Sequence, residues 1–273
     1  LTTGPAVKKF ENKLYQATGG AEVAVCSSGT AALHLAAMAL NIGPGDQVIV
    51  PTITFLSTAA VIRHVGADVL FADVDPNSGL MEVVQFEDAI KVAKNSARAA
   101  IPVHLGGQTP DMEEIANLAN KNNIEVVEDA SHSIGGSYIV DGKKIPVGSC
   151  IYSDMTTFSF HAIKTISMGE GGAVTSKRAN IVNRIKKLRS HGMTAIPGDF
   201  KNSQLAFGPS QDVNSWYYEM HELGLNYRAS DLHCALGLSQ MNKLKTFKKR
   251  REQIVSLYDK LLEELNPLVK PVF

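Results

Sequence analysis

The chain has 273 residues, 44% of them apolar and 20% charged, which is typical of a globular protein with a large core and excludes a disordered one. Lysine plus arginine and aspartate plus glutamate number 27 each, so no net charge draws the chain to nucleic acid or to an anionic membrane. Cys26, Cys150 and Cys234 are too scattered for a disulfide framework or a metal motif, so we expect a cytoplasmic protein without bound metal. The longest apolar stretch, residues 31–42, is too short for a bilayer, and we expect no membrane span.

Short apolar or β-branched runs alternate with helical patterns along the whole chain. This alternation predicts an α/β fold in which about seven strands form a mainly parallel sheet covered by helices. The predicted strands are residues 23–26, 47–50, 68–72, 99–103, 124–128, 155–160 and 172–175. The predicted helices are residues 5–17, 30–39, 57–64, 81–93, 111–120 and 179–190.

Three further segments complete the predicted organisation. Asp141–Gly142 is a hairpin-turn signal between short strands at 137–140 and 143–147. Residues 191–215 have no clear period and many Gly, Pro, Ser and Asn residues, which predicts a long functional loop. Residues 229–265 read as helical with a break near 243–246. The chain begins at Leu1 rather than Met and stops at Phe273 just after Pro267 and Pro271, so both ends look cut.

The segment from Cys26 to Leu33 reads CSSGTAAL, so a strand ends in small residues just before a helix begins. The first turn of a helix has free backbone N–H groups and a positive dipole end, and Gly29 lets a phosphate come close to them. This pattern indicates a phosphate cradle. On this segment alone, however, a simple serine cap of the helix is the commoner explanation.

A buried strand runs into acidic residues in VVEDASH, residues 126–132. Ligands of open α/β sheets bind outside the carboxyl ends of the strands, which places Asp129 where a site is expected. The alternative is a structural aspartate that caps the next turn, and His132 alone is more often a loop histidine than a catalyst.

A single lysine, Lys164, follows an aromatic strand and precedes a glycine-dense turn in TFSFHAIKTISMGEGG, residues 157–172. A lysine amine held in a restricted pocket forms Schiff bases with carbonyl compounds. Without these flanks a solvated surface lysine would be the better interpretation. The three features together require a ligand with a phosphate, a protonated ring nitrogen and an aldehyde, and pyridoxal phosphate has all three.

This combination resembles the DegT/DnrJ/EryC1/StrS sugar aminotransferases, a family of fold-type I pyridoxal phosphate enzymes. The resemblance covers the whole chain, through the motifs SGTAA (28–32), EDASH (128–132), 159–172, NYRAS (226–230) and ALGLSQ (235–240). It implies that residues 1–240 form the large domain that binds the cofactor, and that 241–273 form a helix leading into a small C-terminal domain cut short at Phe273. It also implies that the enzyme aminates a keto sugar carried on a nucleotide. The expected partners are the nucleotide sugar and an amino-acid donor, most simply glutamate.

The resemblance also implies roles for single residues. Lys164 holds the cofactor as a Schiff base and moves protons, and Asp129 pairs with the pyridinium nitrogen. Phe55 lies against the ring, although an ordinary core phenylalanine is an equal alternative. His132 contacts the phenolic oxygen, at a position where many relatives have glutamine. The residues implied for the cofactor phosphate are Ser28, Gly29, Thr30 and Ser159.

Asn226 matches the family residue that reaches the cofactor phosphate of the partner subunit, which implies a homodimer with shared active sites. A turn residue before a helix is the alternative for Asn226. Within the family, residues 159–164, 169–172 and 189–193 are similar to the 4-aminotransferase of the pseudaminic acid route. Perosamine and 4-amino-arabinose aminotransferases share much of these motifs, so the motifs do not identify the sugar.

Three other interpretations compete with this one. A sugar dehydratase of the same family typically has histidine in place of the Schiff-base lysine, whereas this chain has Lys164. A leading segment and most of the small domain of the family are missing, so a catalytically incomplete cofactor-binding fragment is a second alternative. A basic run between Lys243 and Arg251 could suggest nucleic-acid binding, but such a run on a helix is usually a solvated face.

Overall fold

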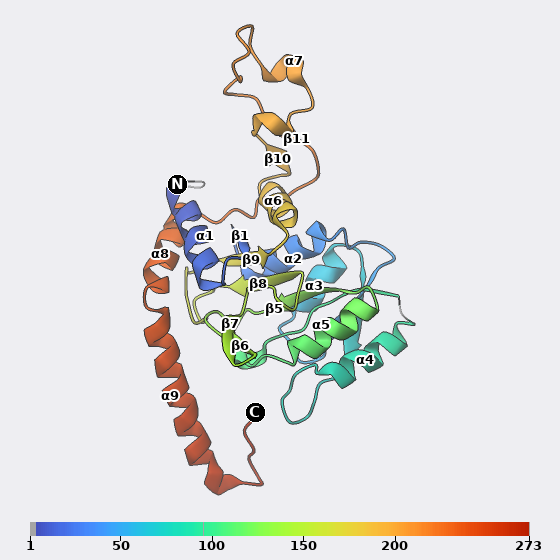
Figure 1. The fold of residues 1–273 in the computed structure, drawn as a ribbon, viewed down its shortest axis with the longest axis vertical. Coiled ribbons are helices and arrows are strands. Elements are labelled where there is room, and N and C mark those ends of the chain that lie inside the picture. The colour runs from blue at the N-terminus through green and yellow to red at the C-terminus, as the bar shows by residue number, and fades with distance from the viewer. Residues whose placement is uncertain (1–3, 95, 273) are drawn as a thin grey trace.

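The computed structural model describes residues 4–94 and 96–272. They form a seven-stranded sheet with helices on both faces, which confirms the α/β prediction (Figure 1). In sheet order the strands are β1 (Glu22–Cys26), β9 (Gly172–Ser176), β8 (Met155–Ser159), β5 (Glu125–Asp129), β4 (Ala97–Ala100), β2 (Gln47–Pro51) and β3 (Asp68–Ala72).

All strands of this sheet except β9 run in the same direction. β2 is parallel to β3 and β4, and the parallel set continues through β5 to β8. β9 is antiparallel to both of its neighbours, β8 and β1, so β1 points the same way as β8. The carboxyl ends of β1, β8, β5, β4 and β2 therefore meet at one edge of the sheet, where ligand sites of such folds lie.

Each face of the sheet has its own hydrophobic core. In β1 the side chains of Val23 and Val25 join one core and those of Ala24 and Cys26 join the other, because successive strand residues point to opposite faces. The first face is covered by α1 (Pro5–Ala17), α4 (Val83–Val92), α5 (Met112–Lys121) and α8 (Asp231–Met241). The second is covered by α2 (Gly29–Ala39), α3 (Ser57–His64) and α6 (Ala179–Leu188).

The strand predicted at 99–103 is misplaced, because β4 spans Ala97–Ala100. Pro102 has no N–H to donate to a neighbouring strand, and beyond it Val103 makes only an isolated bridge to Asp129. The hairpin prediction is confirmed by β6 (Ser137–Val140) and β7 (Lys143–Pro146). Asp141 and Gly142 have φ values of 49° and 73°, as a tight two-residue turn requires.

The segment predicted as an irregular loop, 191–215, is part of an arm that projects from the sheet (Figure 1). β10 (Met193–Thr194) pairs with β11 (Glu219–Met220), and the 3₁₀ turn η2 (Pro197–Asp199) and helix α7 (Ser203–Ala206) lie between them. The loop prediction missed these elements because strands of two residues leave no alternating pattern to detect. Its functional role stays a prediction.

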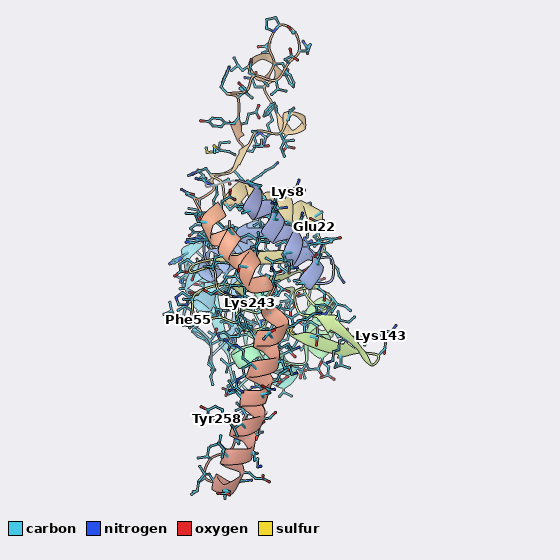
Figure 2. The ribbon with its side chains drawn as sticks, turned by 90° about the vertical axis from the view of Figure 1, so that its left-hand side faces the viewer. Lys8, Glu22, Phe55, Lys143, Lys243 and Tyr258 are labelled. Atoms are coloured by element: carbon cyan, nitrogen blue, oxygen red, sulfur yellow. The ribbon has the colours of Figure 1, made fainter. Side chains whose placement is uncertain are left out.

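The helical C-terminal region is interrupted between α8 and α9 (Leu244–Leu262), so the break lies at 242–243, just before the predicted position. The 3₁₀ turn η3 (Glu263–Leu265) follows α9. Figure 2 shows α9 extending from Lys243 past Tyr258, well beyond the end of the sheet. The division into domains at residue 240 stays a prediction.

Candidate active site

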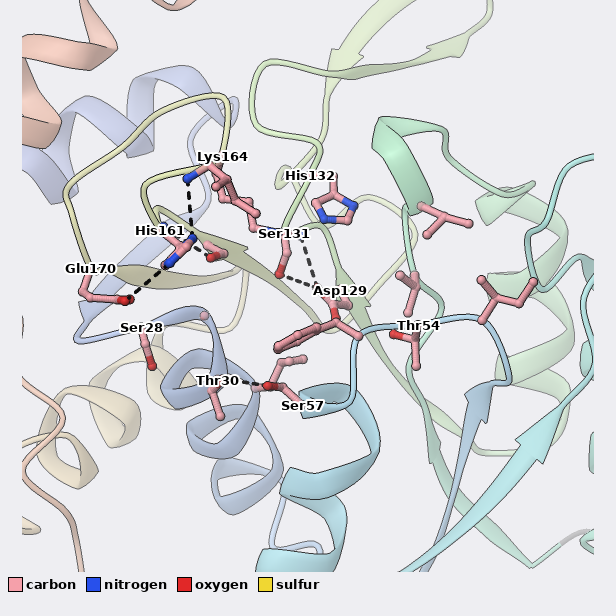
Figure 3. Close-up of a pocket in the computed structure, with 18 residues that line it drawn as sticks. Ser28, Thr30, Thr54, Ser57, Asp129, Ser131, His132, His161, Lys164 and Glu170 are labelled. Carbon is pink, nitrogen blue, oxygen red and sulfur yellow. Dashed lines mark hydrogen bonds and ion pairs between the residues drawn. The ribbon is translucent and has the colours of Figure 1, made fainter. Parts of the chain in front are cut away.

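A cavity of about 580 Å³ opens at the carboxyl edge of the sheet (Figure 3). Its walls come from the segments that follow β1, β2, β4, β5 and β8. Eight of the nine site residues predicted from the sequence line it: Ser28, Gly29, Thr30, Phe55, Asp129, His132, Ser159 and Lys164.

One end of the cavity is the first turn of α2. The Ser28 hydroxyl accepts a hydrogen bond from the Ala31 amide at 3.0 Å, so the serine cap that competed with the phosphate cradle is present. The cap does not exclude the cradle, because the first amides of a helix still have no acceptor within the helix. Gly29 packs so tightly against β8 that an added Cβ would lie 2.7 Å from the Cβ of Ser159. A glycine is therefore required there.

Asp129 lies at the end of β5 and is only 4% exposed. Its Oδ2 accepts from the Thr58 hydroxyl at 2.8 Å, and its Oδ1 accepts from the hydroxyl and amide of Ser131 at 2.6 and 3.2 Å. Thr54 extends this chain through a 2.7 Å hydroxyl contact with Thr58. Three donors from two segments therefore fix the orientation of the carboxylate. A simple cap of the next turn would account for the bonds from Ser131 but not for the bond from Thr58.

Lys164 lies in the turn after β8, where its amide donates to the carbonyl of His161 at 2.9 Å. Partial burial lowers the pKa of Lys164, against the opposing negative charge of Asp129. Burial makes the neutral amine more accessible, and the neutral amine is the nucleophilic form. Lys164 is therefore a partly buried amine that lines the cavity, which differs from a fully solvated surface lysine.

His132 separates the Lys164 side of the cavity from the loop after β4 (Figure 3). Its Nδ1 accepts a hydrogen bond from the Gly106 amide at 3.2 Å, within the 3₁₀ turn η1 (Leu105–Gly107). Partial burial lowers the pKa of His132, the charge of Lys164 lowers it further, and Asp129 opposes both. The neutral ring with Nδ1 as acceptor carries its proton on Nε2, which is then free to donate.

Phe55 is 66% exposed, which excludes the core phenylalanine that the sequence left as an alternative. Asn226 is exposed and does not line the cavity, and its backbone makes an isolated bridge to Ser190. Sequence reasoning missed Thr58 and Ser57, whose hydroxyls reach Asp129 and Thr30, because nothing local marks their distance from those partners. Ser131 stood inside the acidic motif and could have been found there.

Two more missed residues lie next to each other on one side of the cavity (Figure 3). His161 Nε2 lies 3.7 Å from Glu170 Oε1, and both side chains are about half exposed. Both residues belong to the motif around Lys164, so the sequence contained the signal for them. Within residues 4–94 and 96–272, no group of three His, Cys, Asp or Glu side chains is arranged to hold a metal ion.

No helix in the described part of the chain is long and apolar enough to cross a membrane.

The architecture, with a lysine and an aspartate in one cavity at the carboxyl edge of a mostly parallel sheet, is that of fold-type I pyridoxal phosphate enzymes. Residues 1–272 match the model of the DegT/DnrJ/EryC1/StrS aminotransferase family, and the chain belongs to this family.

Two curated relatives and one solved structure illustrate the similarity. The spore coat polysaccharide biosynthesis protein SpsC of Bacillus subtilis is 37% identical over 99% of this chain and 65% of its own length. UDP-4-amino-4,6-dideoxy-N-acetyl-beta-L-altrosamine transaminase of Campylobacter jejuni is 38% identical over 97% of this chain and 64% of its own. The chain thus spans slightly less than two thirds of these relatives.

A candidate sugar aminotransferase of Streptococcus pneumoniae superimposes with a TM-score of 0.84 in its PMP-form, at 29% identity. The match covers 96% of this chain and 66% of that one, and the same protein is known in a PLP-form. The predicted family and fold class are therefore confirmed, and pyridoxal phosphate is confirmed as the cofactor of the family.

Proposed function

We propose that this chain forms the cofactor-binding part of an aminotransferase that moves an amino group from an amino acid onto a keto sugar carried on a nucleotide. One observation carries the proposal: the amine of Lys164, the carboxylate of Asp129 and the first turn of α2 line one cavity. Pyridoxal phosphate has an aldehyde, a ring nitrogen and a phosphate to match these three, so the residues fit the cofactor.

When bound, the cofactor supplies a ring that draws electrons away from the carbon bearing the amino group. Asp129, held by Thr58 and Ser131, binds the ring N–H and keeps it protonated. Lys164 would hold the aldehyde group of the cofactor, and its amine would move a proton between two carbons. The lowered pKa of Lys164 makes the neutral amine, the form that can accept a proton, more populated.

The remaining predicted residues bind and orient the cofactor. Ser28, Gly29, Thr30 and Ser159 form the end of the cavity proposed for the phosphate. Phe55 would lie against one face of the ring, and His132 would donate from Nε2 to the phenolic oxygen. This donation agrees with the bond that His132 Nδ1 accepts from Gly106 on its other side.

The finer assignment is a UDP-linked 4-keto-6-deoxy sugar as acceptor and glutamate as donor, in the synthesis of a pseudaminic acid type of surface glycan. Its support is the similarity to the Campylobacter jejuni transaminase and the motif around Lys164. Perosamine and 4-amino-arabinose types of acceptor are the alternatives. Parallel assays with UDP- and GDP-linked 4-keto sugars decide among them, and a preference for the GDP sugar overturns the finer assignment.

We also propose a cytoplasmic homodimer with shared active sites. Ile53, Phe55 and Ile163 line the cavity and have exposed side chains, which a partner subunit would bury. Asn226 would reach the cofactor phosphate of that partner. Mixing the inactive variants Lys164→Ala and Asn226→Ala tests this, because a mixed dimer has one intact site only if Asn226 acts across the interface. Absence of any recovered activity contradicts shared sites.

The first experiment on the function is the visible absorption spectrum of the purified protein with pyridoxal phosphate, before and after glutamate. We expect a band from the lysine-bound cofactor that bleaches when glutamate donates its amino group. A band that ignores glutamate and other amino acids indicates a fragment that binds the cofactor without catalysis. A spectrum identical to free pyridoxal phosphate overturns the assignment of Lys164.

A further inference from the structure

We propose that the buried pair His104–Glu128 is a positioning device for the cofactor site, because it anchors the turn that holds His132 and the main chain of Asp129. His104 and Glu128 touch neither the cavity nor its expected contents. Their proposed effect is on the placement of residues that do. The inference rests on the proposed function in one respect only, namely that the edge of the cavity binds the cofactor.

The pair lies under the cavity, inside the protein. Both side chains are 0% exposed, and His104 Nε2 lies 3.0 Å from Glu128 Oε2. Glu128 precedes Asp129 on β5, so the two carboxylates point to opposite sides of the sheet. The carboxylate of Asp129 lines the cavity, whereas that of Glu128 is buried on the opposite side of the sheet.

Glu128 is well supplied with partners for an ionised, buried carboxylate. Hydroxyl groups of Tyr138, Ser153 and Thr156 donate to it, the last at 3.0 Å. Burial alone would raise the pKa of Glu128, but the contact with His104 and the charge of His104, together with Ser153 and Tyr138, hold it below its ordinary value. A fixed negative charge therefore lies beside the His104 ring.

The backbone of His104 connects this charge to the site. Its amide donates to the carbonyl of Asp129 at 3.0 Å, and its carbonyl accepts from the Gly107 amide at 3.1 Å. Inside the turn so formed, the Gly106 amide donates to His132 Nδ1 at 3.2 Å. Gly106 and Gly107 have φ values of 64° and 99°, so the turn depends on flexible glycines and needs an external anchor.

His104 differs from the other partners of Glu128 in where it lies along the chain. Tyr138 belongs to the β6–β7 hairpin, and Ser153 and Thr156 belong to β8 or the turn before it. His104 alone among these partners belongs to the turn that contacts His132. Losing His104 or the charge of Glu128 should therefore displace the turn, whereas losing Tyr138 should weaken the same buried cluster without displacing it.

The test compares three variants with the wild-type chain. His104→Asn removes the ring, and Glu128→Gln keeps the shape of the side chain but removes its charge. Tyr138→Phe is the matched control, because it removes one hydrogen bond from the same carboxylate and leaves His104 in contact with Glu128. For each protein we would measure the free energy of unfolding, the NMR signals of the His132 ring without cofactor, and the affinity for pyridoxal phosphate by fluorescence.

We expect His104→Asn and Glu128→Gln to shift the His132 ring signals and to weaken cofactor binding by about tenfold to a hundredfold, the cost of displacing binding groups by about 1 Å. Tyr138→Phe should lower stability and leave the His132 signals and cofactor affinity unchanged. Equal effects of all three on cofactor affinity, in step with stability, overturn the proposal. Unchanged His132 signals in Glu128→Gln overturn it as well, and this variant suffices if His104→Asn does not fold.

The same experiment separates this inference from the proposed function. If the wild-type chain does not bind pyridoxal phosphate, the function proposed for the cavity fails. The His132 signals of the cofactor-free proteins still decide whether the pair positions the turn. If the wild type binds the cofactor and the variants bind it equally well, the function stands and the positioning role is wrong.

Discussion

The cavity lies at the carboxyl edge of the sheet, where its lining comes from the ends of buried strands and the segments after them. The arm at 191–222 instead projects away from the sheet on two strands of two residues each (Figure 1). The carboxylate of Asp129, at the end of β5, accepts a hydrogen bond from Thr58 in α3, which lies 71 residues away in the chain. In the arm, Glu219 instead collects donors from its own neighbourhood: the amides of Lys201 and Asn202 at 2.9 Å and the hydroxyl of Tyr217 at 2.8 Å.

The two regions also differ in how their aromatic rings are used. The arm has a small cluster of its own, in which Phe200 packs edge-on against Phe207 and Tyr217 at centroid distances of 6.3 and 4.9 Å. Beneath the sheet edge, Phe158 and Phe160 are almost fully buried in the main core. The difference implies that the cavity shares the stability of the whole domain, while the arm can open without it.

The largest effect is expected from Lys164→Ala in the cavity. Loss of the amine should reduce amino transfer by on the order of 10⁴-fold, the upper range for removal of a positioned proton-transfer group. The unfolding transition should stay unchanged, since Lys164 is a partly exposed turn residue. Rapid-mixing absorbance with glutamate measures the loss. Lys177→Ala, an exposed lysine, is the control, and equal losses in both variants contradict a specific role.

Asp129→Asn should have the next largest effect. The neutral amide cannot keep the ring nitrogen protonated, so we expect transfer to slow by on the order of 10²- to 10³-fold, as for other lost electrostatic partners at active sites. The absorption band of the bound cofactor should persist, because Lys164 is intact. A variant with wild-type rates would remove Asp129 from its proposed role. Single-turnover kinetics with glutamate provide the measurement.

Ser28→Ala tests whether Ser28 only caps helix α2 or also helps to bind the cofactor phosphate. Loss of the cap should cost about 1 kcal/mol of stability and should also weaken cofactor binding. Asp111→Ala is the matched control, because Asp111 caps α5 through the Glu114 amide at 3.1 Å and does not line the cavity. Thermal unfolding and cofactor titration of both variants are needed. Equal cofactor affinity in both would reduce Ser28 to a structural cap.

The smallest expected effect is a loss of stability of the arm at acidic pH. The hydrogen bond with His221, with further help from the Asn202 and Lys201 amides, lowers the pKa of Glu219 from 4.5 to about 2. A lowered carboxyl pKa stabilises the folded arm fully above pH 4.5, and this contribution disappears as the pH falls towards 2. Trp216 is the single tryptophan of the chain, so its fluorescence reports on the arm.

We expect the Trp216 signal of the wild type to change between pH 4.5 and 2, and this pH dependence to flatten in Glu219→Gln. Far-ultraviolet circular dichroism, which follows the sheet and helices, should be the same for both proteins in that range. Coincident transitions of fluorescence and dichroism in both proteins would show that the arm does not open independently of the sheet.

Local sequence patterns predicted the strands and helices of the main domain and identified candidate residues for the site. Period-two and helical patterns fix strands and helices within a few residues, because side-chain direction along an element is a local property. Ser28, Asp129 and Lys164 were identifiable because each lies at the end of a strand or within five residues after it, and strand ends of parallel sheets meet at one edge. The error at β4 came from Pro102, because the strand ends at Ala100, three residues earlier than hydropathy indicates.

Which distant residues complete the candidate site depends on the three-dimensional fold, and local patterns do not predict it. The hydroxyl of Thr58 meets Asp129, and His104 meets Glu128, because crossover helices and neighbouring strands bring them together, and no local pattern records such a meeting. The arm escaped prediction for the same reason: its two short strands pair across 24 intervening residues without any periodicity of their own. Local preferences specify the elements, whereas long-range packing specifies which side chains touch.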